Sequence, residues 1–191
     1  ITSVEAFYTL GDGSAGDAFG GAVALEGNTA VVGAPLDDSA RGNDSGSAYV
    51  FVRTTSEWVL QAHLSDGSGK SRDNFGYALS LSGDSILIGA PNAVVGAFVK
   101  GNAFVFVRNG STWSQQTKWV GEDGDRFGCS VALDGDHALI GAENDRPASG
   151  PGQGSVSHYQ RIGSTWTFQS KLVDSDGAID DYFGSSVCLD G

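Results

Sequence analysis

The chain has 191 residues, and its 23 acidic and 11 basic residues give a formal net charge of −12 at pH 7. This charge argues against a nucleic-acid partner, because binding to phosphates requires a basic face. No apolar run approaches the roughly 18 residues of a transmembrane helix, so we expect no membrane span. The 40% hydrophobic residues and 29 glycines favour a folded core of short strands joined by tight turns.

One segment recurs along the chain. Its Phe-Gly pair starts at four positions, Phe19, Phe75, Phe127 and Phe183. A Gly-Ala pair follows 14 residues after each of the first three, at Gly33, Gly89 and Gly141. Such a period predicts a repeat array. We place full units at about 19–74, 75–126 and 127–182, with partial units at 1–18 and 183–191.

Each unit is predicted to form four strands, as the first unit illustrates. Residues 21–25 alternate large apolar and small side chains, which is the period-2 pattern of a strand with one bulky face. A short turn at 26–28 leads to residues 29–34, which are apolar on both faces, as in a fully buried strand. A long variable loop at 36–46 precedes a third strand at 47–53, and a fourth starts near Trp58.

The same pattern continues to the end of the chain. Further strands are expected at 77–81, 85–90, 102–108 and from Trp113, then at 129–133, 137–142, 155–161 and from Trp166. Residues 1–10 match the end of a unit, and residues 185–189 match a first strand. Helical periodicity is absent, so the predicted fold class is all-β. Repeated units of four antiparallel strands predict a β-propeller with about three and a half blades.

The two ends of the chain do not complete a ring. The first residues offer only a fourth strand and the last only a first strand, so a shared blade would lack its two middle strands and leave open sheet edges. The sequence also starts at Ile1 and contains no methionine. We therefore expect a piece of a larger propeller in a longer chain, or one subunit of an assembly of several copies.

The repeat resembles the FG-GAP repeat of the integrin α-subunit head and of many secreted proteins. The resemblance spans essentially the whole chain and rests on Phe-Gly, on the spacing, and on Gly-Ala-Pro at 33–35 and 89–91, where Glu143 replaces the proline of the third copy. It implies a propeller that is extracellular or at the cell surface. We expect each Phe to fill the wedge between blades, and each Gly to permit close backbone approach. The recurring Arg and Trp are expected to pack between blades: Arg53, Arg108, Arg161, Trp58, Trp113 and Trp166.

Calcium is the cofactor that the resemblance suggests. Integrin-like repeats hold it in an Asp-x-Asp-x-Asp-Gly loop between strands 1 and 2, but here those turns carry at most two acids and cannot supply six to eight oxygen ligands. Other acids offer a candidate Ca²⁺ site: Asp174, Asp176, Asp180 and Asp181, and then Glu122, Asp123 and Asp125. The favoured alternative is that the Asp before each Phe caps a turn through its carboxylate. These residues are Asp17, Asp73, Asp125 and Asp181.

Strand order gives the propeller one acidic, loop-rich face. In an up-and-down blade, the connections after strands 2 and 4 emerge on the same side, and these connections carry most of the acids. Variable loops commonly carry function. The candidate partner-binding residues on this face are Asp37, Asp38, Asp44, Val94, Val95, Phe98 and Asp145. Residues 92–99 are apolar, and either form a contact patch or fold back on the core.

The sequence shows no sign of an enzyme. His63, His137 and His158 fall at different positions in their repeats, and no nucleophile or phosphate-loop motif accompanies them. Cys129 and Cys188 are expected to be unpaired thiols. We therefore expect a non-catalytic recognition, adhesion or structural module that binds a protein or glycan at the cell surface or in the matrix. The alternative is a propeller domain attached to a secreted hydrolase whose catalysis lies elsewhere.

Overall fold

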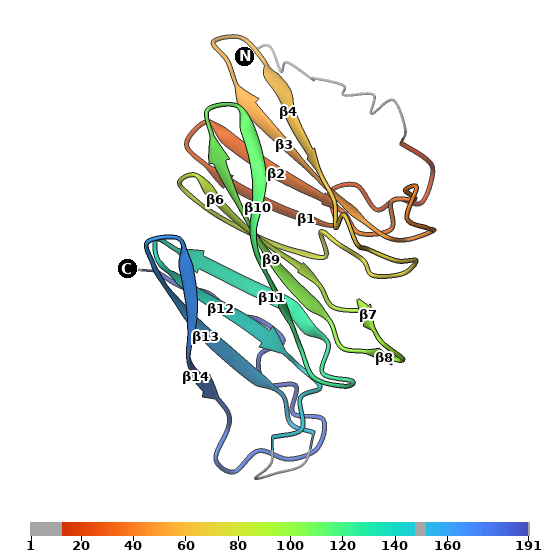
Figure 1. Cartoon of the computed structure of the whole chain (residues 1–191), viewed down its shortest axis with the longest axis vertical. Helices are drawn as coiled ribbons and strands as arrows, with labels where there is room; N and C mark the ends of the chain where they lie inside the picture. Colours follow the sequence, from red (N-terminus) through yellow and green to blue (C-terminus); the bar gives the residue numbers. More distant parts are fainter. Residues whose placement is uncertain (1–12, 148–151, 191) are drawn as a thin grey trace, which may run out of the picture.

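The computed structural model describes residues 13–147 and 152–190, and its core consists of three four-stranded antiparallel sheets that follow one another along the chain (Figure 1). Blade 1 contains β1 (Ala22–Glu26), β2 (Thr29–Ala34), β3 (Ser47–Arg53) and β4 (Trp58–Leu64). Blade 2 contains β5 (Ala78–Ser82), β6 (Ser85–Ala90), β9 (Asn102–Asn109) and β10 (Thr112–Val120). Blade 3 contains β11 (Phe127–Asp134), β12 (His137–Ala142), β13 (Ser155–Ile162) and β14 (Thr165–Leu172).

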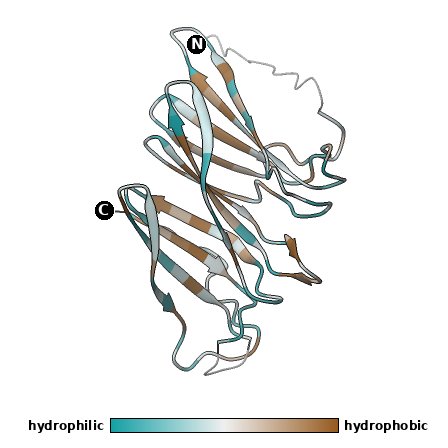
Figure 2. Ribbon diagram, viewed as in Figure 1, coloured by the Kyte–Doolittle hydropathy of each residue, from teal (hydrophilic) through white to brown (hydrophobic). Residues whose placement is uncertain are grey.

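A small hairpin of β7 (Val94–Val95) and β8 (Phe98–Val99) projects from blade 2. The described residues include no helix, and thus none that is long and apolar enough to cross a membrane. Each four-stranded sheet pairs its strands in chain order, which confirms the all-β class and the predicted propeller blades. The hydrophobic colouring in Figure 2 lies mainly along the strands and on the β7–β8 hairpin.

How deeply the second strand of a blade is buried depends on whether another blade packs on each side of it. In β6, all six residues are buried, because blade 2 lies between blades 1 and 3. In β2, Val31 is fully buried, whereas Ala30 and Val32 on the other side are only half-buried. Val23 and Leu25 of β1 are 69% and 68% exposed. This face of blade 1 is therefore exposed at β1, whereas Phe19 packs against Tyr49 and Phe51 elsewhere on it.

The hydrophobic core lies between blades. One cluster combines Val31 and Val50 of blade 1 with Ile86 and Ile88 of blade 2, and Phe75 sits among them with no exposed surface. Its ring lies 5.1 Å from that of Phe104, edge to face. The second cluster joins blades 2 and 3 in the same way. Phe127 belongs to it, so the predicted wedge role is confirmed for Phe75 and Phe127, whereas Phe19 is 47% exposed.

The Gly-Ala pair marks the point where the next blade crosses. A Cβ added to Gly89 would collide with the backbone carbonyl of Gly128, the glycine of the following Phe-Gly pair. The pairs Gly33 with Gly76 and Gly141 with Gly184 show the same contact. The Phe of each pair is also tied to the previous blade through its backbone, since Phe75 N donates to Ser45 O at 3.0 Å. Only glycine permits such close backbone approach.

The recurring Arg and Trp residues link neighbouring blades. The Arg108 guanidinium lies 5.2 Å from the centre of the Trp113 ring. Arg108 Nη1 donates to Thr29 Oγ1 of blade 1 at 3.1 Å, and Trp113 Nε1 donates to Gln61 Oε1 at 2.9 Å. Blade 3 repeats the arrangement: its Arg161 and Trp166 bond to Ser85 and Gln116 of blade 2. The predicted packing between blades is therefore confirmed for these four residues, whereas Arg53 bonds to Asn28 of its own blade.

The prediction of a strand at 185–189 was wrong. This segment forms no strand, and its neighbourhood contributes one isolated bridge, between Gly154 and Phe183. A strand requires a hydrogen-bonded partner, and no described residue supplies the second strand of a fourth blade. The strand expected within residues 1–10 lies outside the described residues. Cys129 and Cys188 are both free thiols, as expected; Cys129 is buried and Cys188 is exposed.

Candidate functional site: the loop face

The connections after strands 2 and 4 of each blade gather at one end of the three sheets, which lies to the right in Figure 1. We call this end the loop face; it comprises residues 35–46, 65–74, 91–101, 121–126, 143–147, 152–154 and 173–182. Backbone hydrogen bonds join its loops, as from Gly124 N to Val99 O at 2.7 Å and from Asp180 N to Gly152 O at 3.0 Å. The predicted placement of these connections on one side is thus confirmed.

The Asp two residues before each Phe caps a turn. Its carboxylate accepts a hydrogen bond from the backbone N–H three residues earlier, at 2.5–3.0 Å in the four copies: Asp17 from Ser14, Asp73 from Lys70, Asp125 from Glu122 and Asp181 from Ala178. Three of these side chains, all but Asp181, are buried or nearly so. The turn-capping interpretation is therefore confirmed, and the recurrence of this Asp has a structural cause.

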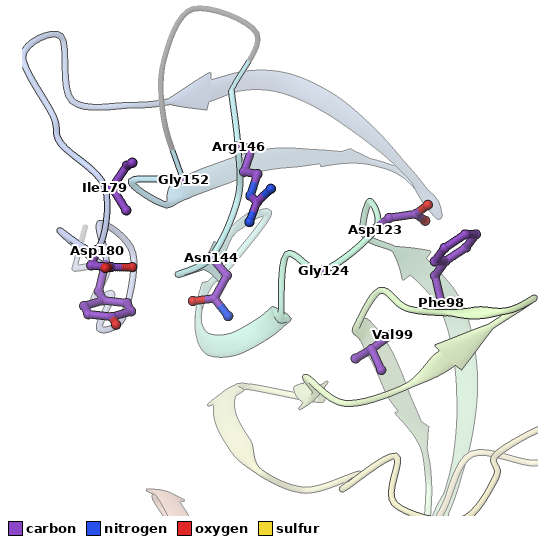
Figure 3. Close-up of a pocket in the computed structure, with 10 residues that line it drawn as sticks. Phe98, Val99, Asp123, Gly124, Asn144, Arg146, Gly152, Ile179 and Asp180 are labelled. Carbon is purple, nitrogen blue, oxygen red and sulfur yellow. The ribbon is translucent and has the colours of Figure 1, made fainter.

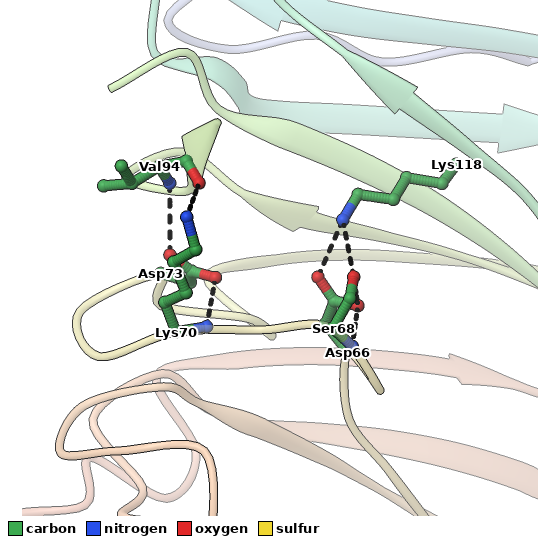
Figure 4. Close-up of polar contacts among 6 residues, drawn as sticks. All are labelled: Asp66, Ser68, Lys70, Asp73, Val94 and Lys118. Atoms are coloured by element: carbon green, nitrogen blue, oxygen red, sulfur yellow. Dashed lines mark hydrogen bonds and ion pairs between the residues drawn. The ribbon is translucent and has the colours of Figure 1, made fainter. Parts of the chain in front are cut away.

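A lysine on the last strand of blade 2 neutralises a buried acid on the loop face. Lys118 Nζ lies 2.9 Å from Asp66 Oδ2, and Ser68 donates to the same carboxylate (Figure 4). Burial alone would raise the pKa of Asp66, but the hydrogen bonds from Lys118 and Ser68 outweigh it and hold the pKa below its ordinary value. Asp66 therefore remains ionised in the folded state.

The equivalent lysine of blade 3 faces a larger acidic cluster. Lys171 Nζ lies 2.7 Å from Asp145 Oδ2 and 3.9 Å from Glu122 Oε1. Asp125 lies close enough to Asp145 to feel its charge, and only 5% of it is exposed. Burial, followed by repulsion from Asp145, raises the pKa of Asp125 to about 6. Lys171 thus lies beside three acids, Asp145, Glu122 and Asp125, and burial disfavours the ionised form of Asp125.

Asp125→Asn should stabilise the protein at neutral pH. Because the pKa of Asp125 rises from 3.8 to about 6 on folding, its contribution to stability is complete below pH 3.8 and is lost as the pH rises through about 6. Asparagine keeps the acceptor for Glu122 N–H without the charge. We expect a gain of about 2–3 kcal/mol at pH 7.5 that disappears near pH 4, measured by urea unfolding at both pH values.

Asp66→Asn is the matched comparison, and its expected effect on stability at neutral pH has the opposite sign. Since the pKa of Asp66 is lowered on folding, its contribution is present above pH 3.8 and is lost as the pH falls through the folded-state pKa. This variant should destabilise the protein at pH 7.5. A loss of stability for Asp125→Asn at pH 7.5 would contradict the assignment of a disfavoured charge.

Blade 1 carries a histidine where the other blades carry this lysine. His63, Lys118 and Lys171 each lie five residues after their Trp. His63 Nε2 lies 2.8 Å from Ser47 Oγ, and its ring stacks on Tyr49, whose hydroxyl donates to Asp37 at 3.1 Å. The sequence reasoning missed this cation position, although its constant spacing from the Trp was a usable signal.

The seven candidate calcium ligands do not come together. Asp174, Asp176, Asp180 and Asp181 are exposed, and Asp123 pairs with Lys100 at 2.8 Å. Glu122 and Asp125 belong to the Lys171 cluster. Among residues 13–147 and 152–190, no group of three or more His, Cys, Asp or Glu side chains is placed to hold a metal ion. Calcium binding stays a prediction.

The residues predicted for the partner-binding face divide into two groups. Asp37 and Asp145 are only 2% exposed and lie inside the polar clusters, so neither presents its carboxylate to a partner. At the surface are Asp38, Asp44, Val94, Val95 and Phe98, with Phe98 56% exposed. The structure therefore leaves the exposed Asp38, the half-buried Asp44 and an apolar hairpin on the loop face.

A groove of about 850 Å³ runs beside this hairpin (Figure 3). Phe98 and Val99 form one side, and Ile179 and Tyr182, from the segment that leads to Phe183, form the other. Polar groups of Asp123, Asn144, Arg146 and Asp180 complete the lining. Ile179 is 67% and Tyr182 48% exposed. The sequence had singled out Phe98 for partner binding and Asp123 and Asp180 for calcium, but neither Ile179 nor Tyr182.

Comparison with known proteins identifies the repeat. Four segments match the model of the FG-GAP repeat, at residues 3–51, 58–106, 113–159 and 166–191. No curated protein matches the chain. The matched segments cover most of the sequence, and the segments 58–106 and 113–159 each run from the last strand of one blade into the next blade. The chain therefore belongs to the FG-GAP repeat family.

Proposed function

We propose that this chain is a non-catalytic recognition or adhesion module, located outside the cell or at its surface, that binds a protein or glycan through the loop face. FG-GAP repeats build propeller modules that often take part in adhesion and ligand binding. The groove between the β7–β8 hairpin and the segment 178–182 is the observation that carries the proposal.

The groove has the properties of a binding surface rather than of a packing surface. Its apolar side chains Phe98, Val99 and Ile179 are exposed and belong to neither of the clusters that join the blades. Exposed apolar groups in a concave surface typically mark contact sites. Hydrogen bonds at its base, such as Asn144 N to Asp125 O at 3.2 Å, attach the lining loops to the blade junction. These hydrogen bonds connect the lining loops to the scaffold of the blades.

The polar groups of the groove supply orientation. Arg146 and Asp180 place opposite charges between apolar walls, and Asn144 offers an amide that both donates and accepts hydrogen bonds. An apolar group of the partner would contact Phe98 and Ile179. Polar groups beside it would bond to the polar side chains of the groove. The charge that remains exposed around the groove is mainly acidic, since Asp174, Asp176 and Asp180 all reach the solvent.

Phe98→Ser and Ile179→Ser should each abolish most of the binding without affecting the fold. Both side chains are exposed, so their loss leaves the blade cores intact. We expect the affinity for a bound ligand to fall at least about tenfold, as for an apolar contact at an interface centre. Binding is measured on immobilised matrix proteins and on a glycan array.

Ile162→Ser is the matched control. Ile162 is 71% exposed but is the last residue of β13, next to the turn into β14 at the end of the blade opposite to the loop face. Its replacement should leave binding unchanged. If Ile162→Ser weakens binding as much as Phe98→Ser, or if neither groove variant weakens it, the groove is not the binding surface.

A further inference from the structure

Two histidines meet on the face of blade 3 that points away from blade 2. His137 lies on β12 and His158 on β13, and the register pairs Leu139 with His158. His137 is two residues from Leu139 and so projects from the same side of the sheet. His137 Nδ1 lies 3.0 Å from His158 Nε2, and the two rings are stacked at 5.3 Å. This contact could not be predicted from the sequence, because the two residues occupy different repeat positions.

The internal repeat shows that these histidines are unusual. At the position of His158, blades 1 and 2 carry Val50 and Val105, both fully buried in the clusters between blades. At the position of His137 they carry Thr29 and Ser85, which accept the hydrogen bond from the Arg of the next blade. Blade 3 thus replaces two packing positions by two imidazoles. Neither histidine belongs to an apolar cluster within the described part of the chain.

The pair opens onto a cavity of about 370 Å³. His137, Leu139, His158, Leu189 and Asp190 line it. His137 is exposed and His158 half-buried, so an ion can reach both rings from solvent. The leucines give one apolar wall, and Asp190 places a carboxylate in the same cavity.

We propose that His137 and His158 form a binding site for a divalent transition-metal ion of the Zn²⁺ type. Two nitrogens bound to one Zn²⁺ at its usual bond length stand about 2.9–3.4 Å apart for angles between 90° and tetrahedral, and the observed separation is 3.0 Å. Imidazole suits Zn²⁺, Cu²⁺ and Ni²⁺, whereas Ca²⁺ and Mg²⁺ take oxygen ligands.

Binding requires a change of tautomer and a small rotation of the rings, because nitrogens in a hydrogen bond face each other rather than a common ion. In the hydrogen bond between the rings, one facing nitrogen carries the proton and the other accepts it. When the donor ring carries its proton on the other nitrogen, both facing nitrogens present lone pairs to the ion. Water completes the coordination, and the Asp190 carboxylate lies in the same cavity as a counter-charge. The site is separate from the groove, so it does not depend on the proposed function.

Isothermal titration of the metal-free protein with ZnCl₂ tests the site. The chain has three histidines, so His63→Gln is a matched control for His137→Gln and His158→Gln. Cys188→Ser removes the exposed thiol as a competing ligand. We expect one Zn²⁺ per chain, at least about tenfold weaker binding in either His137→Gln or His158→Gln, and unchanged binding in the two controls. Thermal unfolding without metal verifies that each variant folds.

Cu²⁺ provides an independent readout. The electron paramagnetic resonance spectrum should show coupling to two imidazole nitrogens in the protein and to one in His137→Gln. Unchanged Zn²⁺ affinity in both variants of the pair, or loss of binding in His63→Gln or Cys188→Ser, would place the ion elsewhere and overturn the proposal. Absence of Zn²⁺ binding by the unaltered protein would overturn it as well, leaving the pair as a hydrogen-bonded contact.

Discussion

Phe75→Ala should lower the free energy of unfolding by about 3–5 kcal/mol, as expected for removal of a large buried ring. Phe75 has no exposed surface and sits between blades 1 and 2, against the rings of Phe104 and Phe106 at 5.1 and 6.0 Å. The cavity would open at a blade junction, where the two sheets are held apart by other side chains and cannot collapse fully. Urea unfolding at equilibrium measures the loss.

Phe19→Ala is the matched control, because Phe19 occupies the same motif position in blade 1. It is 47% exposed and contacts Tyr49 and Phe51 edge to face, at 5.6 and 6.4 Å. We expect a loss of about 0.5–1.5 kcal/mol. Equal losses at Phe19 and Phe75 would contradict the assignment of the Phe to the junction between blades, because only Phe75 has a preceding blade among the described residues.

Gly89→Ala should cost about 3 kcal/mol, the upper part of the range for an overpacked core. The added methyl group would meet the backbone carbonyl of Gly128, which cannot move as a flexible side chain can. Relief requires blades 2 and 3 to separate along the whole junction. Thermal unfolding should show a lower transition temperature.

Gly67→Ala is the corresponding control. No atom lies within 4 Å of the position that its Cβ would take, and its φ is not positive. We expect a change of less than about 0.5 kcal/mol. If Gly89→Ala is equally mild, the Gly-Ala pair recurs for a reason other than close approach of the next blade.

Much of the fold could be predicted from the sequence, because the strand signals are local and repeat. The apolar run at 85–90 correctly predicts a strand buried on both faces, and β6 has that burial. The segment 185–189 carries the same local pattern as β1 but forms no strand. Pairing is a property of two segments, so a pattern in one of them cannot establish it.

The site was harder to predict, since burial and proximity decide which acids reach a partner. Strand order placed Asp37 and Asp145 in the loops of an accessible face, whereas hydrogen bonds from Tyr49 and Lys171 hold their carboxylates in the interior. Likewise, the approach of His137 to His158 depends on the register of β12 and β13. Ile179 and Phe98 are far apart in the sequence, and only the packing of the blades side by side brings them to one groove.

The recurrent and the variable residues therefore have separate roles. Phe75, Gly89 and their equivalents join the blades and recur because each junction needs the same contacts. The exposed side chains of Phe98, Val99 and Ile179 belong to neither cluster between the blades and line the groove. In this protein the repeated motif forms the scaffold, and the proposed binding function lies in the variable segments between its copies.

Native-state hydrogen exchange tests this division most directly. The amides of Phe75 and Phe127 donate across blade junctions, to Ser45 O at 3.0 Å and to Lys100 O at 3.3 Å. If these junctions hold the scaffold together, both amides should exchange as slowly as the central strand amides of β6, and far more slowly than residues 96–97 at the tip of the β7–β8 hairpin. Exchange of Phe75 and Phe127 at the rate of that tip would contradict the role assigned to the recurring motif.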